Sequence, residues 1–263
     1  HLSYDYLDAQ WMWDRAKELE IPLMAGSSLP LSWRNPWLEY DKGVHVEEAL
    51  SIGYGGIEAY GYHALETLQC MIERRAGGET GVVSVQCLEG DAVWRARDEG
   101  LWSQDLAEGA CGAVENKPEG RMEDHAKEPA VFLVAHTDGL KTATLILNGY
   151  VQDFAYAARV DGKVHGVEFY LQNDGPFAHF GYLCHNVQQF LQTGKAPYPP
   201  ERTLLVTGII NAVMNGRHEG YRVVETPLLN VAYTSYDEMP FRPTASRPEG
   251  ESTNPNAPDI AGT

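Results

Sequence analysis

The chain has 263 residues, which is enough for one large domain or two modest ones with cores of their own. Its 37 acidic and 20 basic residues give a net charge of −17, and such a surface repels phosphate backbones and anionic membranes, so we expect neither nucleic-acid nor membrane binding. No apolar run approaches the roughly 20 residues that span a bilayer. The four cysteines are far apart and lack zinc-site spacing, which favours a reducing, cytoplasmic location.

The first predicted elements form a helix and a strand. Residues 3–20 have the apolar spacing of an amphipathic helix that Ser3 or Asp5 can cap. Residues 21–25 predict a short buried strand, which the turn-rich segment 26–30 ends. Units of this kind tile α/β sheets, so we expect the rest of that sheet upstream or in a partner.

A glycine-rich turn then leads from a strand at 44–53 into a second helix. The turn delivers His63 and two carboxylates, Glu58 and Glu66, to the start of that helix, where an enzyme can present an acid/base group to a pocket. The alternative is that His63 caps the helix or fills a gap in the core.

The clearest fold signal lies in the middle of the chain. Four β-rich runs are separated by the dipeptides Asp138-Gly139, Asn148-Gly149 and Asp161-Gly162, which favour two-residue hairpin turns. We therefore predict an antiparallel meander with helices on one face, the candidates being the His63 helix and residues 177–192. The four runs are 131–137, 140–147, 150–160 and 164–171.

The remaining segments carry weaker signals. Residues 82–88 predict a strand, 98–114 a weak helix and 113–129 an exposed loop. Near the end, 200–215 predict a helix and 221–225 an edge strand.

Motifs for common chemistries are missing from the sequence. It contains no GxGxxG fingerprint, phosphate loop, GxSxG elbow or HExxH pair. His63 and Glu66 on one helix, with His179 and His185 on another, could form a metal site of nitrogen and oxygen ligands. The alternative is that His179 and His185 flank the polar edge of an amphipathic helix.

An arginine lies between two tryptophans in the segment Trp33-Arg34-Asn35-Pro36-Trp37. Such an arginine can bind a carboxylate or phosphate, or stack on a ring. A seam between domains explains the same residues equally well.

The order of these segments resembles the glucose–fructose oxidoreductase/inositol dehydrogenase/MocA (Gfo/Idh/MocA) family. The resemblance is carried by residues 16–26, the turn with Arg34, Gly61-Tyr62-His63-Ala64-Leu65-Glu66 and the ending at 201–223. That family pairs a Rossmann domain with a C-terminal α/β domain whose open sheet mediates oligomerisation. The resemblance thus implies NAD or NADP as cofactor and a homo-oligomer formed through the antiparallel sheet.

The resemblance also implies a domain organisation. Residues 1–34 would be the end of a truncated Rossmann-like nucleotide-binding domain, with its glycine fingerprint before His1. Residues 35–236 would be the substrate-binding and oligomerisation domain. The composition of residues 237–263, rich in proline and poor in aromatic residues, separately predicts a disordered acidic tail. The expected fold class is α+β: a predominantly antiparallel, open-faced sheet with helices on one face, preceded by the last helix–strand unit of a Rossmann domain.

By the same resemblance, His63 matches the family's catalytic histidine and Glu66 the acidic position three residues later. The family usually has an aspartate four residues before the histidine, whereas this chain has Ala59 there and Glu58 one step earlier. The expected site therefore has His63 and Glu58 in catalysis, Glu66, Tyr60, Trp33 and Arg34 at the substrate, Ser27, Ser28 and Arg34 at the cofactor, and no metal.

The implied function is the C-terminal part of an NAD(P)-dependent oxidoreductase acting on a sugar, a cyclitol or a related hydroxyl compound. The chain alone is expected to be inactive, because it lacks a pyrophosphate-binding turn. One alternative is a catalytically inactive binding or assembly module, which Ala59 motivates. The other is a metal-dependent isomerase or hydrolase that uses His63 and Glu66 with His179 or His185.

Overall fold

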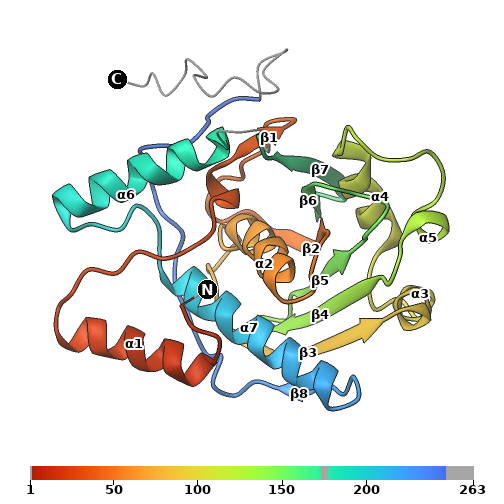
Figure 1. Ribbon diagram of the computed structural model, residues 1–263, viewed down its shortest axis with the longest axis horizontal. Coiled ribbons are helices and arrows are strands. Elements are labelled where there is room, and N and C mark those ends of the chain that lie inside the picture. Colours follow the sequence, from red (N-terminus) through yellow and green to blue (C-terminus); the bar gives the residue numbers. More distant parts are fainter. Residues whose placement is uncertain (1, 173–176, 247–263) are drawn as a thin grey trace.

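The computed structural model describes residues 2–172 and 177–246, and within them the chain forms an α+β fold around one mixed sheet (Figure 1). The strand order is β1-β7-β6-β2-β5-β4-β3-β8, and every neighbouring pair is antiparallel apart from β2 and β5. The strands are Trp33–Asn35 (β1), Val46–Gly53 (β2), Val82–Glu89 (β3), Ala130–His136 (β4), Lys141–Ile146 (β5), Phe154–Val160 (β6), Lys163–Tyr170 (β7) and Val224–Glu225 (β8).

Helices cover both faces of this sheet. Figure 1 shows α2 and α7 on one side, and α3, α4 and α5 on the other. The alternation of side chains along β6 fits this arrangement, because Phe154 and Tyr156 belong to the core under α2 while Ala155 and Ala157 belong to the core under α4. The helices are Tyr6–Glu18 (α1), Ala59–Ile72 (α2), Asp91–Asp98 (α3), Gln104–Ala113 (α4), Met122–His125 (α5), Gly181–Thr193 (α6) and Glu201–His218 (α7), with 3-10 turns at Leu29–Leu31 (η1) and Ala178–Phe180 (η2).

The expectation of an open sheet face is therefore wrong. The predicted weak helix at 98–114 corresponds to α4, whereas α3 and α5 were not predicted, and α4 was not expected to cover the second face of the sheet. The layer on this face is held by small residues, which let α4 approach the sheet closely. The predicted homo-oligomer stays a prediction, and it would need a surface other than an open sheet.

The closest approach of this second layer is at Gly166 of β7. A Cβ atom placed there would lie 2.1 Å from the carbonyl oxygen of Gly109 in α4. We expect Gly166→Ala to lower the free energy of unfolding by about 1–3 kcal/mol in urea melts, because backbone atoms must move to make room. Gly112→Ala is the control on the same helix, since a Cβ there meets nothing within 4 Å. Equal stability of the two variants would contradict this packing.

The predicted meander is half right. Asp138-Gly139 connects β4 to β5 and Asp161-Gly162 connects β6 to β7 as hairpins, the latter with φ of +51° and +69°. At Asn148-Gly149 the chain makes no hairpin, because β2 lies between β5 and β6, with Leu50 opposite Ala143 on one side and Ala157 on the other. Turn residues report the local bend, whereas the choice of strand partner depends on the whole sheet.

The predicted strand at 21–25 is also wrong. These residues form no strand, and Ile21 is 56% exposed, so the helix–strand unit of a Rossmann domain is not seen in the described residues. Helix α1 packs on α7 instead. β1 joins the main sheet edge through β7, with Trp33 opposite Tyr170. The boundary between residues 34 and 35 stays a prediction.

Helix α6 does not cover the sheet as predicted, although it ends at Gly194 in the expected left-handed conformation. It lies to one side of the molecule, and Leu191 is 75% exposed. Residues 237–246, the first part of the predicted disordered tail, run along the protein, with Met239 buried and Arg242 paired with Glu39. The rest of that predicted tail, 247–263, lies outside the described residues.

The final elements agree with the sequence reading. Helix α7 covers the predicted helix at 200–215, and the short strand β8 lies at the sheet edge beside β3. No helix in the described part of the chain combines the length and the apolar character needed to cross a membrane.

Candidate functional site

His63 lies in the second turn of α2, next to the turn that the sequence singled out. The side chain of Asn148 fixes this turn, because it accepts a hydrogen bond from Gly55 N at 2.6 Å and donates one to Gly55 O at 3.2 Å. The Asn148-Gly149 dipeptide thus serves the start of α2 rather than a hairpin. His63 is half-buried, and the rings of Tyr60, Tyr62 and Phe154 contact it edge-on.

The partner of His63 is Ser27, from the segment before η1. Its Oγ lies 2.8 Å from His63 Nδ1 and also accepts a hydrogen bond from Leu29 N at 3.1 Å. A buried hydroxyl needs an acceptor for its proton, and among the described residues His63 Nδ1 is the acceptor within reach. We assign the tautomer in which Ser27 donates to Nδ1, and in that tautomer the proton of the neutral ring lies on Nε2.

Burial lowers the pKa of His63, because the imidazolium form loses hydration. We expect an NMR titration of this ring to give a pKa below the ordinary value of about 6.5. The neutral ring then persists at pH values where a solvated histidine is already charged. Unfolding in urea should bring the pKa back to its ordinary value, and a folded-state pKa above 6.5 would contradict the assigned environment.

His63 borders a cavity of about 280 Å³. Most ligand pockets measure roughly 300–1,000 Å³, so this one suits a small compound. Its walls are largely apolar, and its polar side chains come from two serines, two histidines and two tyrosines. The lining includes Ser27, Ser28, Tyr54, Tyr60, His63, Phe154, Leu171, His179 and Leu183.

Three of the other predicted site residues line the same cavity as His63: Ser27, Ser28 and Tyr60. Tyr54, which directly follows β2, and Phe154, the first residue of β6, also line the cavity, and neither gave a local signal in the sequence. His179 was expected only as a candidate metal ligand. Its signal was a histidine at the start of an amphipathic helix, but nothing in the sequence placed that helix near α2.

Glu66 does not reach the cavity. Its carboxylate is fully buried between α2 and α7, where it accepts hydrogen bonds from Tyr62 Oη at 3.1 Å and Thr203 Oγ1 at 3.0 Å. Burial raises the pKa of Glu66. We therefore assign this residue to helix packing rather than to substrate binding. Three residues along a helix leave two side chains only about 60° apart, and here that offset takes Glu66 to Thr203 of α7 while His63 faces Ser27.

Glu58 faces a different cavity, of about 560 Å³, which Asn211 and Arg217 of α7 also line. Its predicted role beside His63 therefore has no support in the geometry. Position 59, where the family has its usual aspartate, is exposed on the first residue of α2. No carboxylate of the described residues contacts the His63 ring in this arrangement.

Trp33 and Arg34 form part of the interior. Arg34 is 2% exposed, donates to Leu38 O at 2.9 Å, and its guanidinium lies over the rings of Trp37 and Phe169. Trp33 is buried against Tyr182. The aromatic frame around Arg34 is therefore packed inside the protein, and neither Trp33 nor Arg34 lines the His63 cavity.

The residues proposed for a metal site do not come together. Glu66 is held by Tyr62 and Thr203, and the ring of His185 lies on Phe241 with centroids 5.3 Å apart. Across residues 2–172 and 177–246, no three or more histidine, cysteine, aspartate or glutamate side chains are grouped to hold a metal ion.

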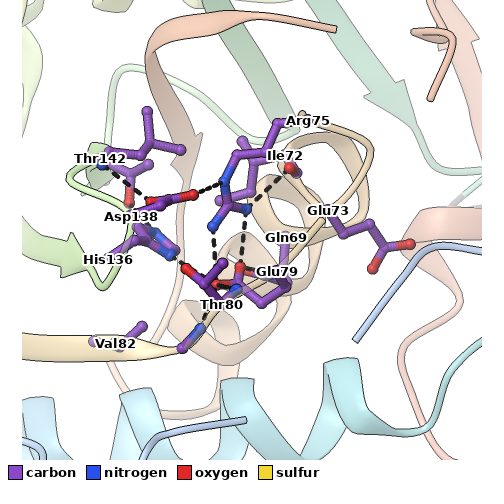
Figure 2. Close-up of polar contacts among 12 residues, drawn as sticks. Gln69, Ile72, Glu73, Arg75, Glu79, Thr80, Val82, His136, Asp138 and Thr142 are labelled. Carbon is purple, nitrogen blue, oxygen red and sulfur yellow. Dashed lines mark hydrogen bonds and ion pairs between the residues drawn. The ribbon is translucent and has the colours of Figure 1, made fainter. Parts of the chain in front are cut away.

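A second polar cluster lies at the other end of α2 (Figure 2). Arg75 donates to both oxygens of Glu79 at 3.0 Å and to Asp138 at 2.7 Å, while His136 Nδ1 lies 3.3 Å from Glu79. Burial alone would raise the pKa of Glu79, but His136 and Arg75 hold it well below its usual range. The ion pairs of this cluster join the end of α2 to β3 and β4, and we assign them to packing.

The fold is α+β, and two histidines, His63 and His179, line one small cavity in it. The chain matches no protein-family model, and no curated protein matches it. The Gfo/Idh/MocA resemblance therefore stays a prediction that rests on the residues quoted above.

Proposed function

We propose that the chain is the C-terminal part of an NAD(P)-dependent oxidoreductase that transfers hydride to or from a sugar, a cyclitol or a related hydroxyl compound. The observation that supports this most is the place of His63. It is a neutral, half-buried imidazole, hydrogen-bonded to Ser27 and bordering a small cavity. The residue that the resemblance marks as catalytic therefore has access to a ligand-sized space.

The Ser27–His63 pair can handle a proton in either direction. When Ser27 donates to Nδ1, the ring presents Nε2–H and can donate to a ligand oxygen. Ser27 Oγ has two acceptor positions and Leu29 N uses one, so it can also accept from a protonated Nδ1. The Nε2 lone pair is then free to take the proton of a ligand hydroxyl.

The described residues do not fit a whole dinucleotide. The His63 cavity is small, Arg34 is turned into the interior, and of the predicted cofactor residues Ser27 and Ser28 border the cavity. The cofactor, when bound, would supply hydride acceptance or donation. The proposal requires the pyrophosphate site from residues beyond those described, and the chemistry of this chain is confined to binding and to the proton at His63.

The test uses the protein as its gene encodes it, with any residues that precede His1. We expect saturable binding of NADH or NADPH by fluorescence, and reduction of the oxidised cofactor with at least one member of a panel of sugars and cyclitols. A protein that binds neither cofactor would contradict the proposal.

A binding or assembly module of the same fold is the second candidate. It is favoured by one observation: Ala59 replaces the usual aspartate, and Glu58 faces another cavity, so His63 has no carboxylate partner among the described residues. This alternative would be supported if the encoded protein binds a polyol and a cofactor but does not oxidise or reduce the polyol.

A further inference from the structure

A second histidine borders the same cavity as His63. His179 lies in η2, is 9% exposed, and its Nδ1 is 2.9 Å from the carbonyl oxygen of Gln172. A carbonyl oxygen accepts hydrogen bonds but cannot donate them, so Nδ1 must carry a proton. In the neutral ring this leaves Nε2 as an acceptor, and no described residue donates to it.

His63 has the opposite arrangement. The Ser27 hydroxyl donates to its Nδ1, which leaves Nε2–H as a donor. Two rings with complementary free nitrogens, one donor and one acceptor, therefore border one cavity of about 280 Å³. The His179 tautomer is set by a backbone carbonyl, and the His63 tautomer follows when the Ser27 hydroxyl, which also lines the cavity, donates to Nδ1.

We propose that His63 and His179 form a matched donor–acceptor pair that binds a small polyhydroxy ligand through two neighbouring oxygens. One ligand hydroxyl donates to His179 Nε2, and the adjacent oxygen accepts from His63 Nε2–H. The choice of a polyhydroxy ligand rests on the proposed function, whereas the pairing of tautomers rests on the hydrogen bonds alone. His179 is thereby a ligand-binding residue that neither the sequence motifs nor the family resemblance assigned.

The rest of the cavity fits such a ligand. Its aromatic walls include Tyr60 and Phe154, whose ring planes are 17° apart, and Tyr54 beside them. Pockets of this kind combine apolar walls with a few polar groups that set ligand orientation. A ligand that offers acceptors but no hydroxyl would leave His179 Nε2 unpaired, and sites built for a hydroxyl reject such analogues strongly.

The first experiment reads the tautomers directly. Long-range proton–nitrogen NMR on the ligand-free protein should show His63 protonated at Nε2 and His179 protonated at Nδ1. His63→Asn and His179→Asn assign the two signals. Identical tautomers at the two rings, or the reverse arrangement, would overturn the proposal whatever the protein catalyses.

The second experiment tests binding by NMR titration with dihydroxyacetone and, as the analogue without hydroxyls, acetone. Dihydroxyacetone should perturb both histidines saturably and bind about tenfold or more tightly than acetone. In His179→Asn the amide can still donate to the Gln172 carbonyl, so we expect an unchanged melting temperature. The acceptor at Nε2 is lost, so we expect dihydroxyacetone to bind about tenfold more weakly.

Wild-type binding strength in a folded His179→Asn variant would overturn the proposal, as would the absence of any dihydroxyacetone binding to the wild-type protein. These failures differ from failure of the proposed function. The oxidoreductase proposal falls when neither nicotinamide cofactor binds the encoded protein, a result that leaves the tautomers and the dihydroxyacetone titration unaffected.

Discussion

Arg202→Met is expected to lower the free energy of unfolding by about 3–5 kcal/mol, the largest stability effect of a single substitution that we predict. Arg202 of α7 is 1% exposed and forms a two-bond ion pair with Glu73, Nε to Oε2 at 2.7 Å and Nη2 to Oε1 at 2.6 Å. Tyr233 and Ser235 also donate to Glu73. Removing Arg202 leaves a carboxylate buried without its counter-charge.

Urea melts of three variants separate this cause from general damage. The double variant Arg202→Met/Glu73→Leu removes both charges and should be more stable than Arg202→Met, although two hydroxyl donors then lose their acceptor. Arg15→Met removes one partner of an exposed pair with Glu18 and should cost at most about 1 kcal/mol. A loss of similar size in Arg15→Met and Arg202→Met would contradict the assignment of a buried ion pair.

His63→Asn is expected to reduce kcat of the encoded protein by about 10²–10⁴-fold, the range typical of a lost general acid or base. The asparagine amide can still reach Ser27, as Nδ1 does, but nothing replaces Nε2 at the cavity. Because the Ser27 contact is kept, the variant should melt within a few degrees of the wild type. The measurement is steady-state turnover with the polyol and cofactor found for the wild-type protein.

His45→Asn is the matched control for this experiment, since His45 is exposed and lies away from the His63 cavity. It should leave kcat unchanged. A folded His63→Asn variant with wild-type turnover would remove His63 from the chemistry and favour the binding-module alternative.

Local features of the fold were predictable where they depend on neighbouring residues. The two hairpins at Asp138-Gly139 and Asp161-Gly162 and the helix after the His63 turn follow from turn chemistry and apolar spacing. The insertion of β2 between β5 and β6 did not follow, because strand partners far apart in sequence leave no periodic signal.

The site was predictable only in part, because contacts between residues far apart in sequence leave no local signal. His63 and the 26–30 turn were singled out, but their 2.8 Å contact joins residues 36 positions apart. Arg34 and Glu66 were misplaced because charged side chains were expected at a ligand, whereas these two are buried and paired inside the protein. Buried charges with partners look the same in a sequence as charges at a site.

The deciding measurement is a distance in a crystal structure of the encoded protein bound to a sugar or cyclitol that it uses as a substrate. That distance runs from His63 Nε2 to the nearest ligand oxygen. We expect one hydroxyl or carbonyl oxygen at about 2.6–3.2 Å, within hydrogen-bond reach for proton transfer. A ligand bound in another cavity, or one in this cavity with its reacting oxygen beyond the reach of His63, would contradict the role proposed for this residue.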